Sequence, residues 1–423
     1  TEDLRYFFPT TMMETGYDIL FFWVARMIMM SLEFTGEIPF EAIYLHGLVR
    51  VSSGQKMSKS YGNVVDPLEL MEKFGTDALR FTLLTGSTPG QDSKMNLEKL
   101  EANRNFANKL WNVGRLIMNA VEHGSFSHDE DSPLSNADRW ILSRLAQIQM
   151  SVDRLFAAYQ YGEAGRQLYG FFWGEFADWY LEIAKLQLDE GDGTAGRTTK
   201  IMVQVFDACL RMLHPFMPFV TEELWGYLKR TCEEKSAGYQ PTGGWEEALI
   251  VARWLAADEG VAQQVEVVEN FQVFMDIVTA IRNARLEKGV ELRRRIPAAI
   301  QAGISAEYLA SLSAAIAVLA GIDSEQFQIE EALDERPENA LALVIHGVEI
   351  YLPLEGMLDL DKEKQRLQEQ LAEAVSQKGR IEELLAGPFT ERAPADVVER
   401  ERAKLRSFQE TAEKIKQQLK SLS

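Results

Sequence analysis

Apolar side chains recur at alternating intervals of three and four residues along residues 356–423, which is the spacing of a heptad repeat. Such side chains line one side of a helix, and a second helix must cover them. Ala386-Gly387-Pro388 interrupts the repeat with residues that end helices and leaves two arms of similar length. We therefore predict an antiparallel coiled-coil hairpin, with a coiled coil between two chains as the alternative. The two seams are Leu360, Leu367, Leu371, Ala374, Ile381 and Leu385, and Val398, Leu405, Phe408, Ala412, Ile415, Leu419 and Leu422.

In the remaining sequence the pattern of apolar residues, glycine and proline changes twice. Residues 1–65 mix short β-type runs with Gly and Pro, and they predict a strand over residues 42–46 and a helix, buried on most faces, over residues 17–32. From Asp66-Pro67 the pattern becomes helical and continues as a bundle with helices over residues 97–121, 140–159, 161–188 and 198–229, the last kinked or divided by Pro215 and Pro218. Residues 256–355 predict a small α+β module with a helix over 271–287, a strand over 296–300, a helix over 308–319 and a hairpin that turns at His346-Gly347. The predicted fold class is mixed α/β, then mainly α.

Composition narrows the functional classes. The chain has 423 residues, with 44 Lys+Arg against 64 Asp+Glu and a formal net charge of −20. This balance is typical of an acidic cytoplasmic protein and argues against a generic nucleic-acid binder, which needs basic side chains for phosphate. The acid is concentrated in residues 121–355, so the two ends are nearly neutral. The 2 cysteines are too few for a disulfide framework or a four-cysteine zinc site, and we expect neither a metal site nor a membrane segment.

One loop carries a candidate chemistry: Lys56-Met57-Ser58-Lys59-Ser60, which lies between Gly54 and Gly62. By composition alone it is an ordinary solvent-exposed loop. However, two ammonium groups on a loop flanked by glycines can follow and neutralise the phosphates of a nucleotide as they move. The string is also the second signature of class I aminoacyl-tRNA synthetases, and a chance match of five residues is rare.

The resemblance to this family extends along the whole chain. Residues 10–27 and 29–36 resemble the catalytic core of valyl-tRNA synthetases, whereas isoleucyl and leucyl enzymes differ around the Gly16-x-Asp18 element. Residues 103–112, 173–180 and 214–225 resemble the helices of the anticodon-binding bundle. The closing hairpin, with Phe389 and Ala393-Pro394 at its tip, resembles the tRNA-binding arm. The aromatic residues 171–180 and the run Pro215-Phe216-Met217-Pro218-Phe219 are expected to pack in the core rather than to stack on bases.

The resemblance implies an ATP-dependent valine–tRNA ligase that forms valyl-adenylate and transfers valine to tRNA(Val), in the cytoplasm and as a monomer, with Mg²⁺ accompanying ATP. Lys56 and Lys59 would act on the phosphates as the catalytic residues. Trp23 would wall the valine pocket. The implied ATP-binding set is Lys56, Met57, Ser58, Lys59, Ser60, Glu14, Gly16, Asp18, His46 and Gly47, and the candidate tRNA-binding residues are Arg293, Arg294, Arg295, Lys404 and Arg406.

Two parts that the resemblance implies are missing from the sequence. The first class I signature, His-x-Gly-His, does not occur, since His46-Gly47 is followed by Leu48. There is also no editing domain, which the family needs because a hydrophobic pocket rejects threonine poorly. We therefore expect the C-terminal portion of a longer enzyme and no adenylation by this chain alone. The alternatives are a non-catalytic tRNA-binding module and an isoleucyl enzyme.

The predicted domains are a catalytic portion at 1–100, an anticodon-binding bundle at 101–255, an α+β module at 256–355 and a tRNA-binding arm at 356–423.

Overall fold

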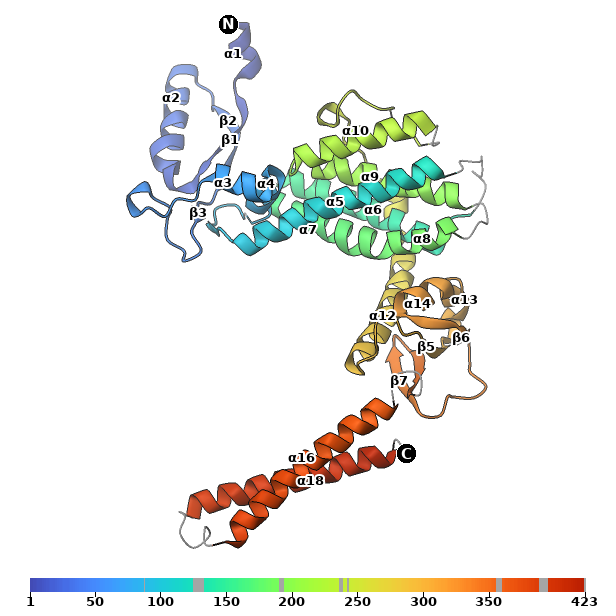
Figure 1. Cartoon of the computed structure of the whole chain (residues 1–423). Helices are drawn as coiled ribbons and strands as arrows, with labels where there is room; N and C mark the ends of the chain where they lie inside the picture. The colour runs from blue at the N-terminus through green and yellow to red at the C-terminus, as the bar shows by residue number, and fades with distance from the viewer. Residues whose placement is uncertain are drawn as a thin grey trace. The chain divides into compact units, whose positions relative to one another are not determined.

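The computed structural model describes residues 1–86, 88–124, 133–189, 194–235, 239–241, 243–354, 360–387 and 395–421. The chain forms two compact units, Thr1–Gln272 and Val273–Ser423. The described part is mainly helical and contains small sheets (Figure 1). This agrees with the predicted mixture of α/β structure at the beginning and mainly helical structure after it.

The first unit opens with a parallel strand–helix–strand segment. β1 and β2 pair in parallel, and a 3₁₀ turn (Tyr17–Ile19), a π-helical turn (Leu20–Val24) and α2 connect them. The predicted strand is present with wider bounds, as β2, whereas the single helix predicted over residues 17–32 is divided into the 3₁₀ turn, the π-helical turn and α2. The elements are α1 (Glu2–Phe7), β1 (Thr10–Gly16), α2 (Ala25–Thr35) and β2 (Phe40–His46).

The prediction that this helix is buried on most faces is wrong. Val24 is buried, but Met29, Met30 and Phe34 are exposed. A sheet of two parallel strands offers too little apolar surface to cover a helix on more than one face. The segment therefore leaves an apolar surface uncovered within the described chain.

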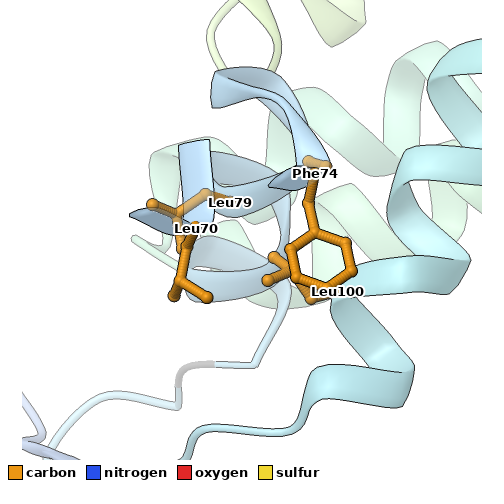
Figure 2. Close-up of a cluster of buried hydrophobic side chains, with 5 residues drawn as sticks. Leu70, Phe74, Leu79 and Leu100 are labelled. Carbon is orange, nitrogen blue, oxygen red and sulfur yellow. The ribbon is translucent and has the colours of Figure 1, made fainter. Parts of the chain in front are cut away.

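Short elements connect this segment to the helices. Asp66 caps α3 by accepting the Leu68 N–H at 2.8 Å, and Asn96 caps α5 by accepting the N–H groups of residues 98 and 99. A buried apolar cluster holds α3, α4 and the start of α5 together, and Figure 2 shows Leu70, Phe74, Leu79 and Leu100 converging there, with Ala78 as its further member. The elements are β3 (Val49–Arg50), α3 (Pro67–Phe74), α4 (Thr76–Thr85), β4 (Ser93–Lys94) and α5 (Leu97–His123), of which β3 and β4 pair in parallel.

A helical bundle follows, as predicted (Figure 1). α5 packs against α9 and α10, and α6 packs against α7 and α9. α9 ends at Leu213 and α10 begins at Pro218, so the two prolines divide this region as expected. Phe171, Phe172 and Phe176 are buried, which confirms core packing for that run. The further elements are α6 (Asn136–Ala157), α7 (Tyr161–Gly170), a π-helical segment (Phe171–Tyr180), α8 (Leu181–Asp189), α9 (Ala195–Leu213), α10 (Pro218–Lys235) and α11 (Glu259–Ala262).

An α+β module forms most of the first half of the second unit. Its sheet has the order β6-β5-β8-β7, with β5 parallel to β6 and antiparallel to β8. His346 and Gly347 both have positive φ and form the predicted hairpin turn between β7 and β8. The helix predicted over residues 308–319 is divided in two, and β6 is a strand that the pattern did not reveal. The elements are α12 (Val265–Glu287), β5 (Ile296–Gln301), α13 (Ala306–Ala310), α14 (Ser313–Ala320), β6 (Ile322–Glu330), β7 (Ala340–Ile345) and β8 (Val348–Pro353).

Among the described residues no single helix is long and apolar enough to cross a membrane. One bent pair, Gly303–Ala310 with Ser313–Ala320, passes that test by length and composition only. Of its larger apolar side chains, Leu309, Ile316 and Leu319 are buried in the α+β module, whereas Ile304 and Val318 are exposed.

Two long helices close the chain, α16 (Leu360–Ala386) and α18 (Ala395–Ser421). They run antiparallel and pack along each other (Figure 1). Of the described seam residues, five are buried, as the heptad spacing predicts, and four are half-buried. The buried ones are Ala374, Ile381, Val398, Ala412 and Ile415, and the half-buried ones are Leu371, Leu385, Leu405 and Phe408. The side chains of seam residues 360, 367 and 419, together with residue 422, Phe389 and Ala393-Pro394 at the predicted tip, lie outside the described residues.

Candidate functional site

The ends of β1 and β2 bring together several of the candidate ATP-binding residues. The two strands are parallel, and Gly16 lies opposite His46 while Glu14 lies opposite Tyr44. A Cβ on Gly16 would lie 2.8 Å from Asp18 Oδ1 and 3.6 Å from the His46 ring, so a hydrogen at this position lets the carboxylate lie against the backbone. Carboxyl ends of parallel strands are where α/β folds bind ligands. The predicted set Gly16, Asp18 and His46 is therefore one cluster.

The lysine loop reaches the same cluster. Lys56 Nζ lies 3.6 Å from Asp18 Oδ2, with the two side chains 64% and 39% exposed. An exposed pair at this distance is screened by water, so the ammonium is available to an anionic ligand. The backbone of Lys59 begins a 3₁₀ turn that ends at Tyr61, and its side chain lies outside the described residues.

Asn63 shapes the loop from its far end. Its Oδ1 accepts the Ser58 N–H at 2.8 Å, and its Nδ2 donates to the Lys56 carbonyl at 3.2 Å. Ser60 N–H donates to Ser58 Oγ at 3.2 Å, while Met57 is half-buried. Gly54 and Gly62 have φ of 86° and 63°, a conformation that favours glycine. The two flanking glycines thus permit the turns at both ends of the loop.

Asp92 lies beneath the strand ends and was not found from the sequence. Its Oδ1 accepts the Leu48 N–H at 2.8 Å, and its Oδ2 accepts the Tyr17 hydroxyl at 3.3 Å and also the Arg50 Nε–H. The hydrogen bond from Leu48, followed by that from Arg50, lowers the pKa of Asp92, and Asp92 in turn raises the pKa of Arg50. Asp92 is therefore an ionised acceptor shared by three donors on two other segments, at residue 17 and at residues 48–50. No local pattern links residues so far apart in the chain.

Gly47 allows the chain segment that carries Asp92 to approach the end of β2. A Cβ on Gly47 would lie 1.6 Å from the Gln91 carbonyl oxygen and 2.8 Å from the Asp92 nitrogen. Both are backbone atoms, which cannot rotate away. Glycine is thus required at this position by space, and its predicted role beside ATP comes in addition to a structural one. His46 Nδ1 shares a hydrogen bond with the Gly47 carbonyl at 2.8 Å.

Trp23 and the basic candidates lie elsewhere. Trp23, on the π-helical turn, is 47% exposed, and the Arg26 guanidinium carbon lies 4.8 Å from its ring centre.

The candidate tRNA-binding residues lie in the second unit. Arg295 donates to the carbonyls of Ala317 and Ile322, which ties it to its own module. Lys404 pairs with Glu401 at 2.7 Å and Arg406 with Glu399 at 3.1 Å, while Arg293 is exposed and Arg294 half-buried. No described group of three His, Cys, Asp or Glu side chains could hold a metal ion.

Three sequence profiles of known families match this chain. Residues 1–96 match "tRNA synthetases class I (I, L, M and V)", residues 138–300 match "Anticodon-binding domain of tRNA ligase", and residues 359–423 match "Valyl tRNA synthetase tRNA binding arm". A valine–tRNA ligase of Dehalococcoides mccartyi is 42% identical over 419 residues, which cover 98% of this chain and 46% of that protein. One of Symbiobacterium thermophilum is 40% identical over 431 residues, covering 100% and 47%.

The chain belongs to the valyl-tRNA synthetase family. It spans about half the length of the curated relatives that it matches. A solved methionyl-tRNA synthetase of Mycobacterium tuberculosis, in complex with methionyl-adenylate, aligns over 54% of this chain and 45% of that chain, with 23% identity and a TM-score of 0.46.

The family matches also bear on what the sequence left open. The described cluster of strand ends, lysine loop and Asp92 lies entirely within the residues that match the class I synthetase profile. The arm profile is described as valyl, and the relatives are named as valine–tRNA ligases. Membership of the valyl-tRNA synthetase family therefore disfavours the isoleucyl alternative.

Proposed function

We propose that this chain functions in a valine–tRNA ligase. In this reaction ATP activates valine to valyl-adenylate, and the valyl group is then transferred to tRNA(Val). One observation carries the proposal: the Lys-Met-Ser-Lys-Ser loop lies beside the carboxyl ends of β1 and β2, with Lys56 Nζ 3.6 Å from Asp18 Oδ2. A cationic loop beside a carboxylate at strand ends is suited to a nucleotide, with phosphates on the loop and sugar at the carboxylate.

In the proposed reaction the two lysines and Asp18 have different roles. The valine carboxylate attacks the α-phosphorus of ATP, and the bond to the β,γ-pyrophosphate breaks. Negative charge develops on the leaving pyrophosphate, where Lys56 and Lys59 would stabilise it, together with the Mg²⁺ that accompanies ATP as substrate. Asp18 would accept hydrogen bonds from the ribose hydroxyls once Lys56 has moved to the phosphates. In the second step the 2′-hydroxyl of the terminal adenosine of tRNA attacks the valyl carbonyl and AMP leaves.

The decisive experiment is valine-dependent exchange between pyrophosphate and ATP by the full-length protein, followed by aminoacylation of tRNA(Val). We expect exchange that requires valine, and the formation of valyl-tRNA. Exchange that is equally fast with isoleucine would contradict the assigned amino acid. The absence of exchange, with tRNA binding retained, would instead establish the non-catalytic tRNA-binding module.

The helical part and the closing hairpin are proposed to hold tRNA, the bundle at the anticodon and α16–α18 along the tRNA body. The bundle and module residues carry most of the acid, whereas residues 356–423 carry as many basic as acidic side chains. Arg and Lys side chains on the exposed sides of α16 and α18, such as Lys404 and Arg406, can exchange their carboxylate partners for phosphates of the tRNA.

Deletion of residues 356–423 should therefore weaken tRNA(Val) binding by about tenfold or more, because phosphate contacts supply much of the affinity for nucleic acid. Adenylate formation should be unchanged, since the hydrogen bonds and ion pairs described for the strand-end cluster all come from residues 14–92. Equilibrium tRNA binding at fixed salt and single-turnover adenylation measure the two effects separately. Equal tRNA affinity with and without the hairpin would refute its role. The double variant Lys404→Ala/Arg406→Ala, which keeps both helices, tests the charges alone.

A further inference from the structure

The carboxylate of Asp92 receives hydrogen bonds from three donors on two segments, one at residue 17 and one at residues 48–50, and each segment adjoins a candidate ATP-binding residue. Tyr17, whose hydroxyl donates at 3.3 Å, directly precedes Asp18. Leu48, whose N–H donates at 2.8 Å, directly follows Gly47. Both oxygens are in use, with Arg50 as the third donor. One side chain thus connects the end of β1 to the end of β2.

Arg50 extends these contacts to the lysine loop. Its backbone forms an antiparallel bridge with Lys56, and its Nη1 donates to the Gly54 carbonyl at 3.4 Å. The guanidinium that Asp92 holds therefore lies at the base of the loop and contacts the glycine at which the loop begins. A shift of Arg50 would move Lys56 relative to Asp18.

We propose that Asp92 is a positioning residue for adenylate formation. It holds the strand ends and the base of the lysine loop in fixed positions relative to one another, and it does not touch substrate. The proposal rests on the proposed function and adds to it a residue outside the signature. A displacement of about 1 Å in a reacting group is enough to cost about a hundredfold in rate. A carboxylate with three donors from two segments that are remote from it in the chain resists such a displacement.

Backbone hydrogen bonds also join the segment that carries Asp92 to the end of β2, without the Asp92 side chain. Gly90 N–H donates to the Leu45 carbonyl at 2.8 Å, Ser93 N–H to Leu48 at 3.0 Å, and Met95 N–H to Arg50 at 2.8 Å. These bonds hold residues 90–95 along residues 45–50 whether or not residue 92 carries a carboxylate. Only the side chains of Tyr17 and Arg50, together with the Leu48 N–H, lose a partner when it is removed. The Asp92→Ala variant should therefore fold, but the strand ends and the lysine loop should no longer be held in their positions relative to one another.

The test is Asp92→Ala in the full-length protein. Valine-dependent exchange should lose about ten- to hundredfold in kcat, with the KM for valine within about twofold of the wild type. Asp66→Ala is the matched control, because Asp66 also accepts a backbone N–H at 2.8 Å but caps α3, away from the cluster. It should leave the kinetics unchanged. An active wild type with an equally active Asp92→Ala variant overturns this inference alone, whereas an inactive wild type overturns the proposed function.

Further variants and a proteolysis measurement test the role of Asp92 if the Asp92→Ala variant folds poorly. Tyr17→Phe removes one donor and should lower kcat in the same direction by about two- to fivefold. If Asp92 acts through Arg50, then Arg50→Met combined with Asp92→Ala should cost no more than the larger single change. Independently of activity, trypsin should cleave after Lys56 about threefold faster in Asp92→Ala than in the wild type or Asp66→Ala. Unchanged cleavage, or full additivity of the two substitutions, would overturn the inference.

Discussion

Lys59→Ala should slow valyl-adenylate formation by the full-length protein about 100- to 1000-fold, with valine affinity changed by less than about twofold. The ammonium is expected to meet the pyrophosphate as negative charge develops there, so its contact is stronger in the transition state than in the bound substrates. Removing it should therefore affect the rate and not the affinity for the amino acid. Single-turnover adenylation measures the first quantity, and equilibrium titration with valine measures the second.

The matched control for this experiment is Lys73→Ala. Lys73 is an exposed lysine in the last turn of α3, so its removal changes the net charge by the same amount without altering the loop. Its adenylation rate should equal that of the wild type. If Lys59→Ala also kept the wild-type rate, the role taken over from the signature would be wrong for this protein. If both variants slowed equally, the effect would come from net charge rather than from the loop.

Asp207→Ala should destabilise the first unit by about 3–5 kcal/mol. Asp207 is fully buried, and its two oxygens accept hydrogen bonds from Arg211 Nε at 3.0 and 3.1 Å, Trp225 Nε1 at 2.7 Å and the Tyr239 hydroxyl at 2.8 Å. Burial raises the pKa of Asp207, while Arg211 and the other donors oppose that rise. Alanine would leave the guanidinium of Arg211, itself almost fully buried, without its counter-charge.

Tryptophan fluorescence reports this change selectively, because all 8 tryptophans lie within Thr1–Gln272. The Tm of the fluorescence transition should fall by about 10 °C. Asp178→Ala is the control, since Asp178 forms an exposed pair with Lys109 at 3.0 Å and its loss should cost at most about 1 kcal/mol. A Tm for Asp207→Ala within about 2 °C of the control would show that this buried pair does not stabilise the bundle.

Much of the helical structure could be predicted because helices are encoded by residues three and four apart. The long helix predicted over residues 97–121 is α5, and the break at Pro215 and Pro218 separates α9 from α10. The hairpin turn at His346-Gly347 also followed from local turn chemistry. The strand β6 did not, because the pairing partner that stabilises it, β5, lies before two intervening helices.

The candidate site was predictable only in part, for the same reason. The lysine loop and the cluster of Gly16, Asp18 and His46 were found through short motifs. Asp92 has no motif, and its contact with Arg50 joins residues 42 apart. Its partners become neighbours only when β3 pairs with β4. The same holds for the steric demand on Gly47, which comes from the backbone of residues 91 and 92 rather than from its own turn.

The sequence by itself determined the heptad seams, the order of α/β and helical segments, and the lysine signature with its family. These depend on residues that are close in the chain, where periodicity and turn chemistry act directly. The tertiary structure alone decided that α2 is left exposed and that Asp92 and Asp207 are shared acceptors for remote donors. It also decided that Lys56 lies beside Asp18. Contacts of this kind have energies that depend on distance in space, and distance in space between remote residues exists only after the chain has folded.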